Sequence, residues 1–163
     1  MLKNLSADHA AELDGKDLKI LDALQTDGRI TMAELGRKVG LSQPAISERV
    51  KRLEENGVIL GYGARINPQS LGFAMTAYIR LRTTYEYVPS CIKRFAEIPN
   101  ILEVHRVTGE DCFIIKVVVP KPSALEGIVN RIAVFGAVIT SVVFRSEPVK
   151  PMGLDLLRTA NES

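Results

Sequence analysis

Thr31–Gly57 reads TMAELGRKVGLSQPAISERVKRLEENG, and this stretch decides the fold of the first half of the chain. Leu35 and Val39 lie four residues apart, as on one face of a short helix that the next glycine ends. Ser42 is placed to cap a following helix, in which Pro44 is tolerated because a first-turn residue needs no intrahelical N–H bond. The stretch therefore predicts two short helices joined by a tight turn.

The helix that opens at Ser42 has distinct buried and exposed sides. Its apolar residues follow spacings of four and three, and Gly57 ends it. Earlier in the chain, Asp14 is placed to cap another helix, whose apolar stripe repeats every three residues. The apolar residues are Ile46, Val50 and Leu53 in the later helix and Leu18, Leu21 and Leu24 in the earlier one. Together these segments predict a three-helix unit of the helix-turn-helix type.

This predicted unit has the chemistry of a DNA reader. A helix in the major groove presents polar and basic side chains opposite its own core stripe. Gln43 is suited to a bidentate base contact, Ser47 to a base or a phosphate, and the later basic residues to phosphates. The predicted DNA-binding residues are Arg37, Lys38, Ser42, Gln43, Pro44, Ser47, Glu48, Arg49, Lys51 and Arg52.

The placement of charge supports this interpretation more than the total does. The whole chain has a net charge of only +2, whereas residues 37–52 contain five basic residues and one acidic residue, a local charge of +4. The alternative is an ordinary solvated helix face in a purely structural module. The combination of a tight turn, a capping serine, Pro44 in the first turn and a glycine that ends the helix favours a DNA-binding function.

In the second half of the chain the spacing of the apolar residues changes, and it predicts a strand–helix–strand–strand–helix–strand order. The strands are expected at Phe73–Arg82, Ile101–Val107, Cys112–Val119 and Val138–Phe144, with one helix starting at Pro89 and carrying Ile92, Phe95 and Ile98, and another capped by Ser123. This is the ferredoxin-like βαββαβ arrangement, an antiparallel sheet with two helices on one face. The other face is open and carries apolar and aromatic residues, which favours self-association.

The expected fold class is therefore α+β, with an N-terminal helix-turn-helix domain and a C-terminal ferredoxin-like domain. We expect a tail and the DNA-binding domain over 1–60 and an extended Gly-punctuated linker over 61–71. The βαββαβ domain, for effector binding and oligomerisation, is expected over 72–150 and a C-terminal tail over 151–163.

Composition argues against several other classes. No apolar run reaches the roughly 18 residues of a spanning helix, and the N-terminus lacks the apolar stretch of a secretory signal, so no membrane partner and a cytoplasmic location are expected. Cys91 and Cys112 are far apart in sequence and lack metal-ligand spacing, so we expect reduced structural thiols and no metal. With histidines only at His9 and His105, and no phosphate loop or catalytic triad, we expect no catalytic residue, no cofactor and no enzyme.

Several motifs carry a resemblance to a known family. In the first half they are Leu13–Asp17, Ile20-Leu21, Leu24, Asp27–Ile30, Glu34-Leu35, Val39–Ser42, Arg49-Val50, Arg52–Glu54, Gly57–Ile59, Gly61-Tyr62, Asn67-Pro68 and Leu71-Gly72; in the second half they are Val107–Asp111 and Gly136–Val143. With these motifs the chain resembles the Lrp/AsnC, or feast/famine, regulators from about Leu13 to Lys150. The resemblance implies a homodimer that assembles further into an octamer and binds a free amino acid between subunits.

Carried over residue by residue, the resemblance places the effector near a hairpin and the last strand. The implied effector-binding residues are Thr108, Gly109, Glu110, Asp111, Thr140 and Ser141. Asp111 suits an α-amino group, and a glycine turn with hydroxyls suits an α-carboxylate. An ordinary solvent-facing hairpin explains the same residues, and His105 is expected in packing or at an interface.

We therefore expect a sequence-specific transcription regulator of double-stranded DNA, modulated by an amino-acid-like effector. The alternative is a nucleoid-associated architectural protein that binds DNA without an effector. Both alternatives use the same DNA-binding surface.

Overall fold

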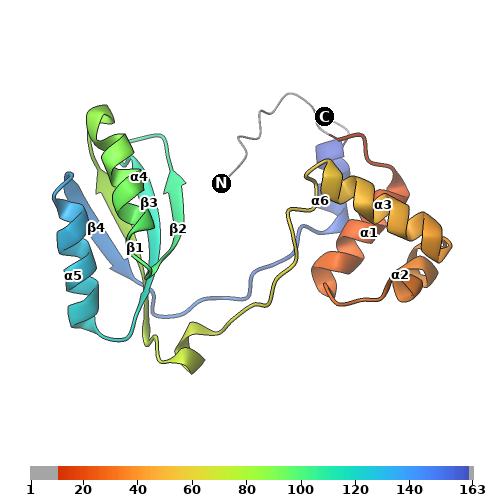
Figure 1. The fold of residues 1–163 in the computed structure, drawn as a ribbon, viewed down its shortest axis with the longest axis horizontal. Helices are drawn as coiled ribbons and strands as arrows, with labels where there is room; N and C mark the ends of the chain where they lie inside the picture. The colour runs from red at the N-terminus through yellow and green to blue at the C-terminus, as the bar shows by residue number, and fades with distance from the viewer. Residues whose placement is uncertain (1–10, 162–163) are drawn as a thin grey trace. The chain divides into compact units, whose positions relative to one another are not determined.

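The computed structural model describes residues 11–161 and divides into two compact units, shown in Figure 1. We call them the helical unit, which comprises the described residues up to Ala64 and from Pro148 onward, and the sheet unit, Arg65–Glu147. The predicted N-terminal tail, with His9, falls largely on residues 1–10, outside the described part. The chain passes from one unit to the other twice.

The helical unit begins with α1, Gly15–Thr26, which Asp14 caps as predicted. Asp14 Oδ1 accepts hydrogen bonds from the backbone N–H groups of Lys16 at 2.8 Å and Asp17 at 2.9 Å. The Asp17 carboxylate in turn accepts from the Asp14 N–H at 3.2 Å, which completes a capping box. The start of α1 is therefore fixed by two acids.

The helix-turn-helix consists of α2, Met32–Val39, and α3, Gln43–Glu55. Gly40 ends α2 with φ +73°, a left-handed conformation that favours glycine. Ser42 occupies the N-cap position as predicted, but within the described part of the chain its side chain makes no cap hydrogen bond, so that part of the prediction is wrong. Gly36 permits the tight turn, because a Cβ there would lie 2.7 Å from the Leu41 carbonyl oxygen.

The apolar stripes of the three helices meet in one core. The buried residues of this cluster are Ile20, Leu21, Ile30, Leu35, Val39, Ile46, Val50 and Leu53. The stripe Ile46, Val50, Leu53 is confirmed and faces inward, so the opposite side of α3 faces solvent. This packing fixes which side of α3 is available to a partner.

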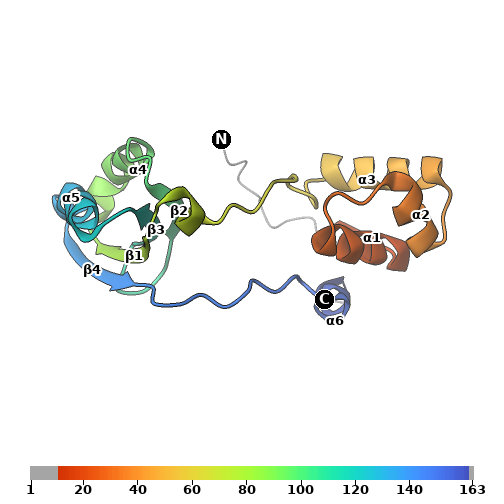
Figure 2. The ribbon, with the colours of Figure 1, turned by 90° about the horizontal axis from the view of Figure 1, so that it is seen from below.

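A further helix, α6, Leu154–Asn161, belongs to the helical unit. The sequence predicted only a tail over residues 151–163. In the structure α6 contacts α1, and Leu157 packs against the core cluster of the helical unit. Figure 2 shows α6 next to α1, with α3 on the other side of α1.

The sheet unit has the predicted βαββαβ order, with its two helices on one face of the sheet (Figures 1 and 2). Its elements are β1 Met75–Arg82, α4 Val88–Ala96, β2 Ile101–Arg106, β3 Phe113–Val119, α5 Pro122–Ala133 and β4 Ala137–Val142, with short 3₁₀ turns η1 Pro68–Leu71 and η2 Tyr85–Tyr87. The antiparallel sheet has the order β2-β3-β1-β4. The ferredoxin-like prediction is therefore confirmed.

Two details of this unit differ from the prediction. Ile92 is 54% exposed, because the buried stripe of α4 runs through Val88, Cys91 and Phe95 instead. Ser123 lies within the first turn of α5, whose N-cap is Lys121, so it does not cap the helix. Both errors are shifts of one or two residues along a correctly predicted helix.

Gly136 has a conformation and a packing environment that only glycine fits. Its φ is +153°, and a Cβ at this position would overlap the carbonyl oxygen of Arg82 at the end of β1. The residue thus lets the chain leave α5 and enter β4 directly against the neighbouring strand.

The fold brings the cysteines together in the core of the sheet unit. Cys91 is fully buried, and Cys112 packs against the same cluster and donates to the Thr83 carbonyl oxygen at 3.0 Å. Burial raises the pKa of the Cys91 thiol, and the nearby Cys112 adds to the effect. Among the described residues there is no group of metal-ligating side chains and no helix long and apolar enough to cross a membrane.

Candidate nucleic-acid interface and effector site

The residues predicted to contact DNA lie on the solvent side of α2 and α3. Gln43, Ser47 and Lys51 are exposed on α3, and Arg37 and Lys38 are exposed in the last turn of α2. Of the ten predicted residues, Arg49 is the one that is half-buried. The helix-turn-helix thus presents nine of these side chains to solvent.

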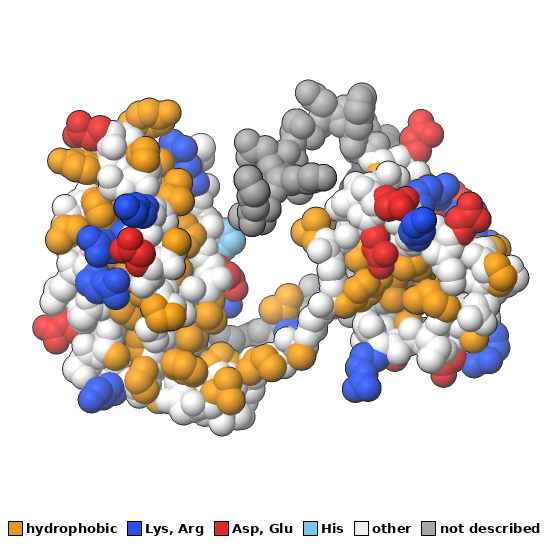
Figure 3. All heavy atoms as spheres, in the orientation of Figure 1, with side chains coloured by type: hydrophobic (Ala, Val, Ile, Leu, Met, Phe, Trp, Pro, Cys, Tyr) orange, Lys and Arg blue, Asp and Glu red, His pale blue; other side chains and the backbone are white. Residues whose placement is uncertain are grey.

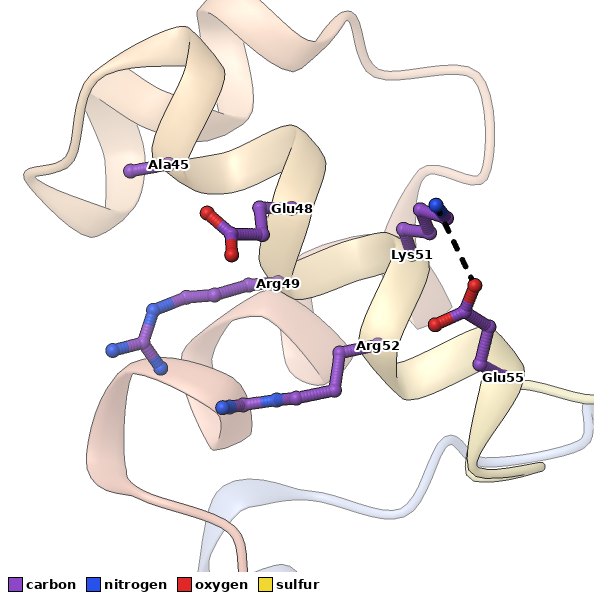
Figure 4. A pocket seen from close by; sticks show the side chains of 6 residues that line it. All are labelled: Ala45, Glu48, Arg49, Lys51, Arg52 and Glu55. Atoms are coloured by element: carbon purple, nitrogen blue, oxygen red, sulfur yellow. Dashed lines mark ion pairs between the residues drawn. The ribbon is translucent and has the colours of Figure 1, made fainter.

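A shallow hollow of about 500 Å³ follows α3 and is lined by Ala45, Glu48, Arg49, Lys51, Arg52 and Glu55. Figure 4 shows Arg49 and Arg52 extending to the same side of the helix, toward α1. Lys51 points elsewhere, and its Nζ lies 3.6 Å from Glu55 Oε1. The basic side chains of α3 are therefore directed to two different places.

Arg49 and Arg52 are held by the acids that cap α1. Arg49 Nη1 lies 2.7 Å from Asp14 Oδ2 and 2.8 Å from Asp17 Oδ1, and Arg52 Nη2 lies 2.9 Å from Asp17 Oδ2. The Asp17 side chain is only 1% exposed, whereas those of Arg49 and Arg52 are 27% and 53% exposed. Asp17 is thus a buried carboxylate that joins the start of α1 to the middle of α3.

The pKa shifts of Asp14 and Arg49 agree with the geometry. The pKa of Asp14 is lowered, first by the backbone N–H of Asp17 and then by the hydrogen bond from Arg49. The pKa of Arg49 is raised, first by Asp14 and then by Asp17. Both shifts favour the charged forms, so the ion pairs persist at neutral pH.

Asp17 is a residue that sequence reasoning missed. The signal for it was present, since Asp14 and Asp17 are three residues apart and so are Arg49 and Arg52. Such spacing places each pair on one side of its helix, where the two pairs can face each other. Recognising the pairing required knowing that α1 crosses next to α3.

Two other contacts position the helix-turn-helix. Lys16 Nζ donates to the carbonyl oxygen of Val39 at the end of α2, where a cation is favourable to the helix dipole. Tyr62 donates to Glu54 at 3.0 Å, and burial followed by this hydrogen bond raises the pKa of Tyr62 to about 12.

On the face shown in Figure 3, acidic and basic side chains of the helical unit lie next to each other.

The predicted effector residues of the hairpin lie at one end of the sheet unit. Gly109 has φ +113°, which suits the β2–β3 turn. Asp111 Oδ2 lies 3.6 Å from Arg80 Nε, with the Asp111 side chain 24% exposed. Thr108 and Glu110 flank the glycine in the same turn, between β2 and β3.

The structure places Thr140 and Ser141 apart from this turn. Both lie on β4, opposite Ile79 and Tyr78 of β1, and β1 separates β4 from β3. Directly opposed residues share a face, so Thr140 is on the helix-covered face and Ser141 on the open face. A single chain therefore does not bring all six predicted effector residues together.

The open face also carries a small charged network. Lys116 Nζ lies 2.7 Å from Glu103 Oε1, and His105 Nε2 lies 3.5 Å from Glu103 Oε2. The Lys116 hydrogen bond lowers the pKa of Glu103, and the same contact raises the pKa of Lys116. On the same face Tyr78 is 37% exposed and lies opposite Lys116, and Ile139 on β4 is 53% exposed, so the face mixes charge with apolar surface.

Both halves of the chain match known protein families. Residues 13–59 match a family described as winged helix-turn-helix DNA-binding, and residues 76–152 match the Lrp/AsnC ligand-binding domain. The chain is 38% identical to YezC, an uncharacterized HTH-type transcriptional regulator of Bacillus subtilis, over 85% of this chain and 99% of the relative. It is 36% identical to LrpA of Mycobacterium tuberculosis, over 74% of this chain and 81% of the relative.

Solved structures agree with these sequence matches. LrpC of Bacillus subtilis superposes with a TM-score of 0.80 at 29% identity, covering 86% of this chain and 100% of that one. A transcriptional regulator of Neisseria meningitidis in complex with L-methionine superposes with a TM-score of 0.81 at 26% identity, covering 89% and 99%. The relatives are named as transcription regulators, which confirms the prediction that the chain is not an enzyme. The chain belongs to the Lrp/AsnC family of transcriptional regulators.

Proposed function

We propose that this regulator recognises a two-part operator with paired α3 helices and responds to a small amino acid bound in its sheet units. The observation that carries the proposal is the exposed polar face of α3, opposite the buried stripe Ile46, Val50 and Leu53. Gln43 and Ser47 would contact bases, and Arg37, Lys38 and Lys51 would contact phosphates. Ser42, Pro44 and Glu48 would border this contact.

Pairing of chains follows from the size of the reading element. One short helix contacts few base pairs, so useful specificity requires a second copy at a fixed distance along the DNA. The open face of the sheet, with Tyr78 and Ile139 exposed, is the surface we assign to self-association. A homodimer that assembles further to an octamer supplies several such helices, and we expect it to act on nucleoid DNA in the cytoplasm.

The effector site is proposed between copies. The hairpin residues Thr108 to Asp111 and the β4 residues Thr140 and Ser141 are separated within one chain, so a second copy would have to complete the site. Regulators of Neisseria meningitidis and Mycobacterium tuberculosis have been solved with L-methionine, which supports an amino acid as the ligand class. Asp111 would hold the amino group and the glycine turn the carboxylate.

Footprinting on the promoter region of its own gene tests the proposal. We expect a few protected blocks spaced by whole helical turns, with affinity falling as salt rises. Continuous protection without sequence preference would instead identify an architectural DNA-binding protein. Adding each amino acid in turn should change the affinity by about 5- to 150-fold for the true effector, the usual range of allosteric coupling.

A further inference from the structure

The strongest feature that the proposed function does not use is the C-terminal helix. The family match in the sheet unit ends at residue 152, and α6, Leu154–Asn161, lies beyond it. The chain reaches α6 only after it has left the sheet unit at Glu147. The helical unit is therefore built from both ends of the chain, with the sheet unit inserted between them.

The segment before α6 is fixed to α1 by a reciprocal pair of hydrogen bonds. The Gln25 side chain donates to the Met152 carbonyl oxygen at 3.1 Å and accepts from the Met152 backbone N–H at 2.9 Å. An amide that satisfies both backbone groups of one residue sets the position of that residue along the helix. The docking of α6 therefore has a defined register.

The apolar side of α6 faces the helical unit. Leu154 and Leu157, three residues apart, are half-buried, whereas Leu156 between them is 59% exposed. Leu157 packs against the core cluster, and with Met152 it lines a hollow of about 380 Å³ shared with Leu21 and Leu24 of α1. Burial of these leucines gives α6 a preferred face.

α6 also lies beside the part of α1 that contacts the DNA-reading helix. Leu154 and Arg158 line a second hollow, of about 430 Å³, together with Asp14, Lys16 and Leu18. Asp14 is bound to Arg49 of α3, and Lys16 is bound to the end of α2. The helix thus lies against the same turn of α1 that positions both helices of the helix-turn-helix.

We propose that α6 is a brace of the DNA-binding unit, whose docking on α1 holds α3 in its DNA-reading position. The inference rests on the proposed role of α3. Because α6 follows the last strand of the sheet unit, it gives that unit a second connection to the DNA-reading helix, besides the segment that leaves α3. Undocking of α6 then lowers DNA affinity.

The test compares Leu157→Asp with Leu156→Asp in the full-length protein. Both variants add one negative charge to the same helix, but only the first replaces a side chain that faces the core. We expect Leu157→Asp to lower hydrogen-exchange protection of the α1 amides about tenfold, the ratio for losing a half-buried leucine, and to weaken operator binding at least threefold. Leu156→Asp should stay within twofold of wild type in both measurements.

A milder variant covers the case in which Leu157→Asp unfolds the unit. Gln25→Ala removes the two bonds to Met152 and should lower α1 protection about fivefold, with the β1 and β3 amides unchanged as an internal control. The proposal that α6 braces α1 fails if α1 protection is unchanged in both Leu157→Asp and Gln25→Ala. It also fails if Leu156→Asp and Leu157→Asp have equal effects. Lower α1 protection with unchanged operator affinity would overturn its role in DNA binding.

Failure of the proposed function gives a different result. If the wild-type protein shows no site-specific binding, the assignment of α3 as an operator reader fails. The hydrogen-exchange comparison still decides whether α6 braces α1, because it needs no DNA.

Discussion

Replacing Asp17 should destabilise the helical unit more than any surface charge change. The carboxylate is 1% exposed and accepts from Arg49, Arg52 and the Asp14 backbone N–H. Removing one partner of a buried ion pair costs about 3 to 5 kcal/mol, because the other charge is left without compensation. Here both arginines reach solvent, with 27% and 53% of their side chains exposed, so water can replace part of the loss. We therefore expect Asp17→Ala to cost about 2 to 3 kcal/mol.

Urea unfolding of the helical unit, monitored by hydrogen exchange at the α2 and α3 amides, measures this cost. Asp17→Asn should cost less, about 1 to 2 kcal/mol, because its amide oxygen still accepts one hydrogen bond. Glu55→Gln is the matched control, since it removes an exposed ion pair with Lys51 and should change stability by less than about 0.5 kcal/mol. If Asp17→Ala costs no more than Glu55→Gln, Asp17 does not join α1 to α3.

Three further predictions concern single residues. Gly136→Ala should destabilise the sheet unit by at least about 2 kcal/mol, because its φ of +153° and the Arg82 carbonyl oxygen both exclude a Cβ; an unchanged melting temperature would contradict this. Since its folded pKa is lowered, Glu103 should contribute stability above its ordinary pKa of 4.5 and lose it as pH falls through the folded value. The stability difference between wild type and Glu103→Gln, measured by urea unfolding from pH 7 to 3, should therefore shrink with acid, and a constant difference would count against the Lys116 pair. In an absorbance titration Tyr62 should ionise near pH 12, and Tyr62→Phe should remove the absorbance change at that pH. If replacing another tyrosine removed this absorbance change instead, the ionisation would belong to that tyrosine.

Local patterns predicted most of the secondary structure, because each helix and strand carried its own signals. Asp14 caps α1 as its position suggested, and the alternation Ala77, Ile79, Leu81 became the buried side of β1. Errors arose where either of two neighbouring apolar residues could be the buried one, as with Ile92 and Cys91 on α4, of which Cys91 is buried. Periodicity selects a face only to within about one residue, and packing against the sheet decides between them.

The site was harder to predict because its geometry depends on contacts between distant segments. The sequence placed Arg49 and Arg52 with Lys51 as phosphate ligands, but the approach of α1 gives both arginines acidic partners. The helix α6 was missed because its apolar pattern is only one or two turns long and becomes meaningful only against α1. The faces of Thr140 and Ser141 likewise followed from strand register, which no single segment specifies.

The ion pairs of α3 limit how many cations the regulator can offer to DNA. Arg37 and Lys38 lie outside every ion pair in the described part of the chain, and Lys51 has only the exposed pair with Glu55, at 3.6 Å. Arg49 and Arg52 would have to leave Asp14 and Asp17 to bind phosphates, which would cost the contacts that position α3. Each phosphate contact contributes about 0.9 to the slope of log K against log salt. Two helical units using three cations each should therefore give a slope of about −5, whereas the five basic residues of the sequence would give about −9. Fluorescence anisotropy on operator DNA between about 50 and 200 mM salt separates the two values. A slope near −9 would show that Arg49 and Arg52 exchange their acids for phosphates on binding, and Asp17 would then hold them only in the free protein.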